Sequence, residues 1–279
     1  MVARAILATV PPMRTISSRQ NPLVHQFRDA ATGRTAGTSL VLLDGPHLVA
    51  TALDAALPMP VAAVMDAELD DPEFADLVAR LEACGADVAV VTSNLMAAMS
   101  PVRTPSGIIA LAECRLADAT SLLAAPSALV LVAADVQDPG NLGALVRAAE
   151  AASATGVIAS GLSADPLSWK AMRGSMGSAL RLPVASALDT RDLVTAAQAA
   201  GLQTIAAVPR DGAAPDAIDW RRPTMLLIGG EGPGLPLGVI DAAGLCVTVP
   251  MAAPVESLNV SVAGALLLYA ARQQRVSVR

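Results

Sequence analysis

The feature of this sequence that most constrains its fold is a set of polar segments in the second half of the chain. Each segment follows an apolar strand and opens a helix; they read DVQDPGNLGALVRAAEA, LLIGGEGPGLP and VPMAAPVESLNVSVA. In open α/β sheets, ligands bind beyond the carboxyl ends of the strands, where such loops gather. We therefore expect these segments to converge on one pocket at one edge of a sheet.

Both halves of the chain alternate apolar strands with helical stretches. In the first half, helices expected at Pro22–Ala31, Pro46–Ala56 and Pro72–Ala83 separate strands such as SLVLLD and DVAVVT, and the second half opens on the strand ALVLVAADV. Strands rich in Val, Ile and Leu that alternate with helices are typical of a largely parallel sheet covered on both faces. The pattern predicts an α/β fold in each half.

The expected organisation is two domains, residues 13–115 and residues 128–279. Residues 116–127 are expected to be a linker, because a fresh, strongly apolar strand follows them. Residues 1–12, MVARAILATVPP, are too short and weakly apolar for a good signal peptide. Because Met13 follows them, we expect either a disordered leader or an upstream start codon. No apolar run reaches membrane-spanning length, and the cysteines form no CxxC pair, so we expect a cytoplasmic protein without a membrane partner.

Several common loop chemistries do not fit the sequence. Lys170 is the only lysine and lies in no P-loop pattern. GGEGPGLP fails the dinucleotide fingerprint, since Leu235 stands where the third glycine belongs, which argues against a dehydrogenase. The only histidines, His25 and His47, lie in the first half, so neither Ser–His catalysis nor a metal site is expected.

The net charge of −6 would ordinarily count against a nucleic-acid partner. The charge is unevenly distributed, however, and the first 35 residues carry several arginines against the single acid Asp29. These are Arg4, Arg14, Arg19, Arg28 and Arg34. A basic arm can attract phosphate whatever the total charge, because salt limits electrostatic reach to roughly 8–10 Å. The alternative interpretation is a solvated helix with arginines on its wet face.

From Ala128 to about Arg272, the chain resembles the SpoU (TrmH-type) family of RNA 2′-O-ribose methyltransferases, within the SPOUT superfamily. The motifs that carry the resemblance are DPGNLGALVRAAEAA, LLIGGEGPGL and VPMAAPVESLNVSVAGALLLY, with KAMRGSMGSALRLPV between the first two. More loosely, ISSRQNPLVHQFRDA, LLDGPHLVATAL and MSPVRTPSGIIALAE are similar to the small RNA-binding domain of rRNA-directed members. The chain departs from the family in its near-complete replacement of lysine by arginine and in its acidic total charge.

The resemblance implies a trefoil-knotted domain that uses S-adenosylmethionine as methyl donor, needs no metal and pairs as a homodimer. It places the cofactor against Gly229, Gly230, Val249, Met251 and Leu258. It assigns catalysis to Asn141, Arg147, Glu231, Ser257 and Asn259, with Glu231 orienting Arg147 or neighbouring polar groups. In the family the arginine is described as a general base. Because a guanidinium normally stays charged, a clamp of Arg147 on an RNA phosphate, with phosphate or water taking the proton, is physically easier. Arg14, Arg19, Arg28 and Arg34 are the expected RNA ligands of the first domain.

The substrate implied is RNA, and large-subunit rRNA is favoured over tRNA because about 127 residues precede the methyltransferase domain. Methylation of tRNA stays open as an alternative. A methylation-inactive ribosome-assembly protein on the same fold also stays open, since fold does not guarantee activity. The presence of Asn141, Arg147 and Asn259 favours an enzyme.

Overall fold

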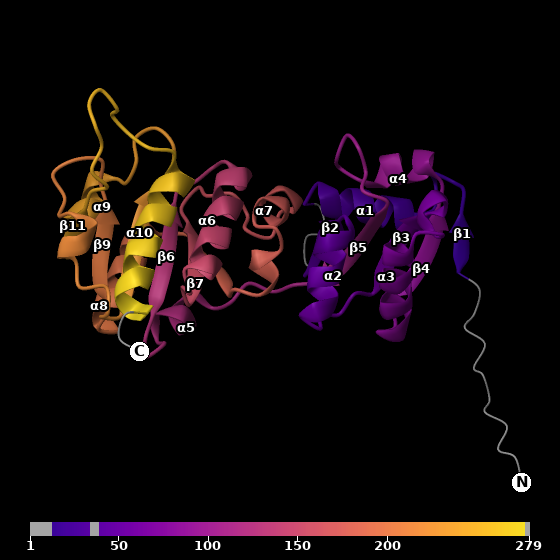
Figure 1. Cartoon of the computed structure of the whole chain (residues 1–279), viewed down its shortest axis with the longest axis horizontal. Coiled ribbons are helices and arrows are strands. Elements are labelled where there is room, and N and C mark those ends of the chain that lie inside the picture. Colours follow the sequence, from indigo (N-terminus) through magenta and orange to yellow (C-terminus); the bar gives the residue numbers. More distant parts are fainter. Residues whose placement is uncertain (1–12, 34–38, 277–279) are drawn as a thin grey trace, which may run out of the picture. The chain divides into compact units, whose positions relative to one another are not determined.

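The computed structural model describes residues 13–33 and 39–276, which form two compact units with one sheet each (Figure 1). The second unit comprises Asp54–Leu57 and the described residues from Cys114 onward; the other described residues form the first unit. The expected leader, residues 1–12, lies outside the described residues, as does Arg34. Within the described ranges, no helix is long and apolar enough to cross a membrane.

The first unit holds a five-stranded sheet in the order β1-β4-β3-β5-β2. Its strands are β1 (Arg14–Ile16), β2 (Leu40–Asp44), β3 (Val61–Met65), β4 (Asp87–Val91) and β5 (Ile108–Glu113). Its helices are α1 (Pro22–Ala31), α2 (Pro46–Asp54), η1 (Asp66–Glu68), α3 (Pro72–Ala83) and α4 (Ser93–Met99). The bounds of α1 and α3 match the prediction, because each begins with proline after a capping side chain, Asn21 or Asp71.

The expectation of a largely parallel sheet is wrong for one strand of this unit. β5 runs antiparallel to both of its neighbours, β2 and β3. The direction of β5 is set by its pairing with β2 and β3, which lie far from it in the sequence, and the apolar pattern of a strand does not report its direction.

The second unit holds a six-stranded, entirely parallel sheet in the order β11-β9-β10-β6-β7-β8. Its strands are β6 (Leu129–Ala134), β7 (Gly156–Ser160), β8 (Val184–Ala187), β9 (Gln203–Ala207), β10 (Thr224–Gly229) and β11 (Leu245–Val247). Its helices are α5 (Ala119–Leu123), α6 (Pro139–Ala151), α7 (Trp169–Gly174), η2 (Ser178–Leu180), α8 (Thr190–Ala199), η3 (Pro215–Ala217), α9 (Leu237–Ala242) and α10 (Val260–Val276). The parallel α/β fold predicted for this half is confirmed.

The chain order reverses between β6 and β10, the two central strands of this sheet. From β6 the chain continues outward through β7 to β8, and it later returns to place β10 on the other side of β6. Ligands of open α/β sheets bind beside such a reversal, outside the carboxyl ends of the strands. The topology therefore puts the segments after β6, β9 and β10 at the same edge.

Part of the segment expected as a linker, residues 116–127, belongs to the folded second unit. It contains α5, whose Leu122 and Leu123 are buried in a core with Val130 and Ile158. Burial of apolar side chains is favourable by roughly 25 cal/mol per Å² of apolar surface removed from water. This free energy favours a packed helical turn over an exposed linker.

Candidate active site

A pocket of about 420 Å³ lies beyond the carboxyl ends of β9, β10 and β11 in the second unit. All the residues expected to hold the cofactor line it: Gly229, Gly230, Val249, Met251 and Leu258. Of the expected catalytic residues, Glu231, Ser257 and Asn259 also line it. Its size is typical of small-molecule sites, which are largely apolar with a few polar groups.

The glycines of the loop after β10 serve two different purposes. Gly232 and Gly234 adopt φ values of +99° and +69°, a region that favours glycine. Gly229 and Gly230, by contrast, do not have positive φ. They are glycines because a Cβ at Gly229 would overlap the backbone of Gly234, and one at Gly230 would overlap the carbonyl of Asp135.

The third polar segment approaches the pocket as an irregular loop rather than as the start of a helix. α10 begins only at Val260, so Glu256 and Ser257 precede it. Asn259 is its N-cap: the Asn259 side-chain oxygen accepts hydrogen bonds from the backbone N–H groups of Ser261, at 2.9 Å, and Val262. Glu256 and Ser257 are therefore loop residues, whereas Asn259 caps α10 and Ser261 lies in its first turn.

Three of the expected catalytic side chains form one hydrogen-bonded chain. The amide nitrogen of Asn259 donates to the side-chain oxygen of Asn141 at 3.1 Å, and the amide nitrogen of Asn141 donates to Oε1 of Glu231 at 2.5 Å. Asn141 is held at the start of α6, where Asp138 caps the helix and accepts from its backbone N–H. The side chains thus link the three sequence motifs, and Glu231 orients Asn141 rather than Arg147.

Arg147 stands apart from this chain. It is exposed on α6 and does not line the pocket. Its guanidinium forms no hydrogen bond or ion pair with any residue of the described ranges. A cation without a protein partner retains its capacity to bind an anionic ligand.

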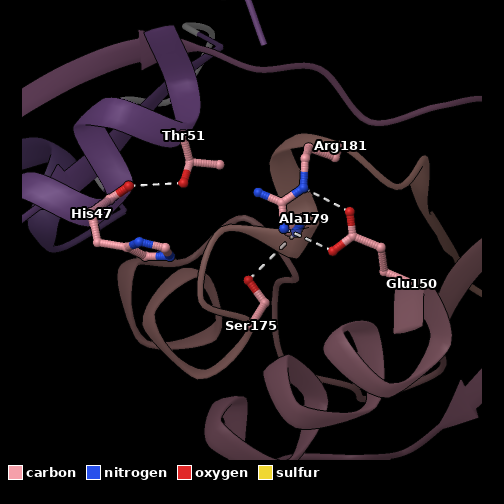
Figure 2. Close-up of polar contacts among 6 residues, drawn as sticks. All are labelled: His47, Thr51, Glu150, Ser175, Ala179 and Arg181. Carbon is pink, nitrogen blue, oxygen red and sulfur yellow. Dashed lines mark hydrogen bonds and ion pairs between the residues drawn. The ribbon is translucent and has the colours of Figure 1, made fainter. Parts of the chain in front are cut away.

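A second arginine, Arg181, is by contrast paired with a carboxylate of α6. Figure 2 shows Arg181, which follows η2, donating two hydrogen bonds of 2.7 and 2.8 Å to the carboxylate of Glu150. These bonds from Arg181 hold the pKa of Glu150 below its ordinary value. The pair tethers the segment after α7 to α6.

The sequence did not single out the contribution of β9 to the pocket. Ala207, Val208 and Pro209, at the end of that strand, line it. The strand itself was predicted, but the segment after it was not among those expected to form the pocket. Its position next to β10 was the missing information.

The arginines expected to bind RNA in the first unit differ in whether they form an ion pair. Arg14 forms a 2.6 Å ion pair with Asp87 across β1 and β4. Arg19 and Arg28 are exposed, with no partner for either guanidinium within residues 13–33 and 39–276. Arg34 lies outside the described residues. Among those same ranges, no group of three or more His, Cys, Asp and Glu could hold a metal ion.

The parallel sheet, its reversal point and the glycine-walled pocket define an α/β protein that binds a small ligand beyond the carboxyl edge of the sheet. The chain belongs to the SpoU rRNA Methylase family, whose model matches residues 128–269.

Similarity to known proteins extends over most of the chain. This chain is 36% identical to an uncharacterized tRNA/rRNA methyltransferase of Synechocystis, and the alignment covers 94% of each chain. It is 29% identical to the 23S rRNA (guanosine(2553)-2′-O)-methyltransferase RlmP of Bacillus subtilis, covering 92% of this chain and 98% of RlmP. The AdoMet-bound crystal structure of an rRNA methyltransferase from Sinorhizobium meliloti matches with a TM-score of 0.83 and 28% identity, over 94% of this chain and 98% of the other.

Proposed function

We propose that this chain transfers a methyl group from S-adenosylmethionine to a ribose 2′-hydroxyl of RNA, with large-subunit rRNA as the substrate. The observation that carries the proposal is the hydrogen-bonded chain from Asn259 through Asn141 to Glu231 beside the pocket. It joins side chains from all three family motifs at one place. Membership of the SpoU family and the relation to RlmP support the reaction and the substrate.

The pocket fits S-adenosylmethionine in its backbone chemistry. Val249, Met251 and Leu258 line it, and their backbone N–H groups form no hydrogen bond within the described part of the chain. Such donors suit the ring nitrogens of an adenine, and the apolar Val208 and Ile240 suit its faces. When bound, the cofactor supplies an activated methyl group on a sulfonium, so the protein's own residues must position the hydroxyl and help remove its proton.

The roles of the side chains follow from this requirement. Arg147 binds the RNA phosphate 5′ of the target, while Asn141 and Ser257 hold the ribose. Alignment of this kind supplies as much as ~7–11 kcal/mol of a reaction barrier. An arginine keeps its charge in proteins, so the hydroxyl proton passes to the RNA phosphate or to water rather than to Arg147.

We further propose that the second unit carries the family's trefoil knot and pairs as a homodimer in the cytoplasm. The exposed face of α10 supports pairing, because Val262, Leu266 and Tyr269 are each nearly half exposed there and recur at helical spacing. Light scattering at micromolar concentration distinguishes a dimer from a monomer.

The preference for rRNA rests on the first unit. The alignment with RlmP, a 23S rRNA enzyme by name, includes the first half of this chain as well as the second. In our proposal, the first unit binds rRNA through Arg19 and Arg28, with Arg14 and Arg34 contributing charge to the same arm.

The test is methyl transfer from tritiated S-adenosylmethionine to protein-free rRNA and to whole tRNA. We expect labelled rRNA and little labelled tRNA. Label in tRNA alone would favour the tRNA alternative. Binding of both rRNA and S-adenosylmethionine without any transfer would favour an inactive assembly protein.

A further inference from the structure

The segment KAMRGSMGSALRLPV, residues 170–184, has no role in the function proposed above, although the structure shows how it is held in place. Its helix α7 packs backbone to backbone on the start of α6. A Cβ at Gly143 would lie 2.7 Å from the backbone nitrogen of Ser175, and one at Gly174 would lie 3.0 Å from the carbonyl oxygen of Gly140. Glycines on both helices are therefore required, and they fix α7 against the first turns of α6.

The face of α6 that meets α7 is also the face that carries Arg147. Positions three or four apart on a helix share a side, so Gly140, Gly143 and Arg147 lie along one stripe. One turn further along, Glu150 binds Arg181 from the segment after α7 (Figure 2). Arg147 therefore lies between the contact of α6 with α7 and the Glu150–Arg181 ion pair.

Two more cations lie on the exposed side of α7. Lys170 and Arg173 are three residues apart and exposed, and neither forms an ion pair or hydrogen bond with a residue in the described ranges. The Lys170 Nζ atom lies 5.5 Å from the centroid of the Trp169 ring, which restrains the lysine without neutralising it.

The carboxylates of these segments make other contacts, and among the described residues none of them forms an ion pair with Arg147, Lys170 or Arg173. Asp138 accepts from the backbone N–H of Asn141, Asp165 accepts from that of Leu167, and Glu150 is paired with Arg181. The net charge of the chain is −6, and Lys170 is its single lysine. Arg147, Lys170 and Arg173 nevertheless have no ion-pair partner among the described residues, and they lie on two helices that are in contact with each other. That arrangement complements a run of phosphates, which a single-stranded RNA segment supplies.

We propose that Lys170 and Arg173, together with Arg147, form a track for the phosphates of the substrate RNA on either side of the target ribose. This inference rests on the proposed function and gives the segment after β7 its role. The glycines Gly143 and Gly174 place α7 against α6, and the cations of α7 then bind the RNA strand.

The experiment compares Lys170→Gln, Arg173→Gln and their double variant with the charge-preserving variants Lys170→Arg and Arg173→Lys. The matched control is Arg221→Gln, an exposed arginine before the amino end of β10, at the opposite edge of the sheet from the site. Methyl transfer is measured against rRNA-fragment concentration at several salt concentrations, and fragment binding is measured by fluorescence anisotropy.

Each Gln variant should raise KM for the rRNA fragment several-fold, with a smaller change in kcat and unchanged affinity for S-adenosylmethionine. The log–log salt slope of binding should fall by about 0.7–0.9 per lost phosphate contact. The charge-preserving variants and Arg221→Gln should behave like the wild type.

An unaltered KM and salt slope in the double variant would overturn the proposal. A loss of kcat alone, not rescued by Arg173→Lys, would also overturn it, by showing a purely structural role. If the wild-type protein methylates no RNA, the proposed function fails, and the anisotropy measurements still decide whether α7 binds RNA.

Discussion

The side-chain amide of Asn141, at the start of α6, donates a 2.5 Å hydrogen bond to Oε1 of Glu231, 90 residues further along the chain. The same amide accepts from Asn259, so its oxygen and nitrogen are oriented by two partners. With its nitrogen donating and its oxygen accepting, the Asn141 amide is fixed in one orientation about the Cβ–Cγ bond. This relationship makes Glu231 a positioning residue for Asn141.

Replacing Glu231 by Gln should lower kcat by about 10- to 100-fold, since a hydrogen bond to a charged group contributes roughly 1.5–3 kcal/mol. The affinity for S-adenosylmethionine should change much less, because the predicted cofactor contacts are made by the backbone. Calorimetry and a tritiated-methyl assay separate the two effects. The control is Glu256→Gln, an exposed carboxylate in the loop before α10. Equal kcat in both variants would refute the positioning role.

Arg147→Ala should abolish methyl transfer while leaving S-adenosylmethionine bound. Arg147 does not line the pocket, so its loss leaves the cofactor contacts in place. Among the residues that the structure describes, its guanidinium has no partner whose loss would destabilise α6. The measurement is turnover together with calorimetric binding, with Arg221→Ala as the matched control. Near-normal turnover of Arg147→Ala would contradict its assignment.

How much of this site the sequence predicted depends on the kind of contact. Segments after parallel strands meet at the carboxyl edge of a sheet, so the convergence of the polar loops on one pocket could be predicted. Gly229, Val249 and Leu258, which the resemblance assigned to the cofactor, line that pocket, and their contact with the cofactor stays a prediction. The sequence did not predict that Glu231 would contact Asn141 rather than Arg147. Contacts between side chains from distant segments depend on strand order and rotamer, which periodicity does not report.

For the fold as well, features marked by neighbouring residues could be predicted, whereas features that depend on distant segments could not. The prolines and caps that open α1 and α3 mark their starts locally, so those bounds were correct. The direction of β5 and the presence of the three-residue edge strand β1 depend on pairing partners far along the chain, and neither was predicted. Likewise, the burial of Leu122 and Leu123 in residues 116–127 depends on the core that they meet.

Replacing Arg14, Arg19, Arg28 and Arg34 by Gln should weaken rRNA binding and flatten its salt dependence by about one unit of log–log slope per lost contact. The affinity for S-adenosylmethionine should be unaffected. Arg14→Gln alone should weaken rRNA binding less than Arg19→Gln does, because Arg14 is already paired with Asp87. Filter binding of rRNA fragments at graded salt measures both. Unchanged rRNA binding by the fourfold variant would mean that the arm has another role.

The Glu150–Arg181 ion pair should make a small, pH-dependent contribution to stability. The hydrogen bonds from Arg181 lower the pKa of Glu150 in the folded state, so the stabilisation is present above the ordinary glutamate pKa of about 4.3. It is lost as the pH falls through the lowered value. Both side chains are partly exposed, so the expected size is about 1 kcal/mol or less. Urea unfolding of the wild type and Glu150→Gln should differ at pH 7 and converge in acid; a constant difference would contradict this.

The central claim is tested most directly by locating the transferred methyl group. The protein is incubated with protein-free 23S rRNA and S-adenosylmethionine carrying a deuterated methyl group, and the digested nucleosides are analysed by mass spectrometry. The account predicts label on the ribose of one nucleoside, as a 2′-O-methyl group, and none with Arg147→Ala. Label on a base, or no label although the cofactor binds, would contradict it.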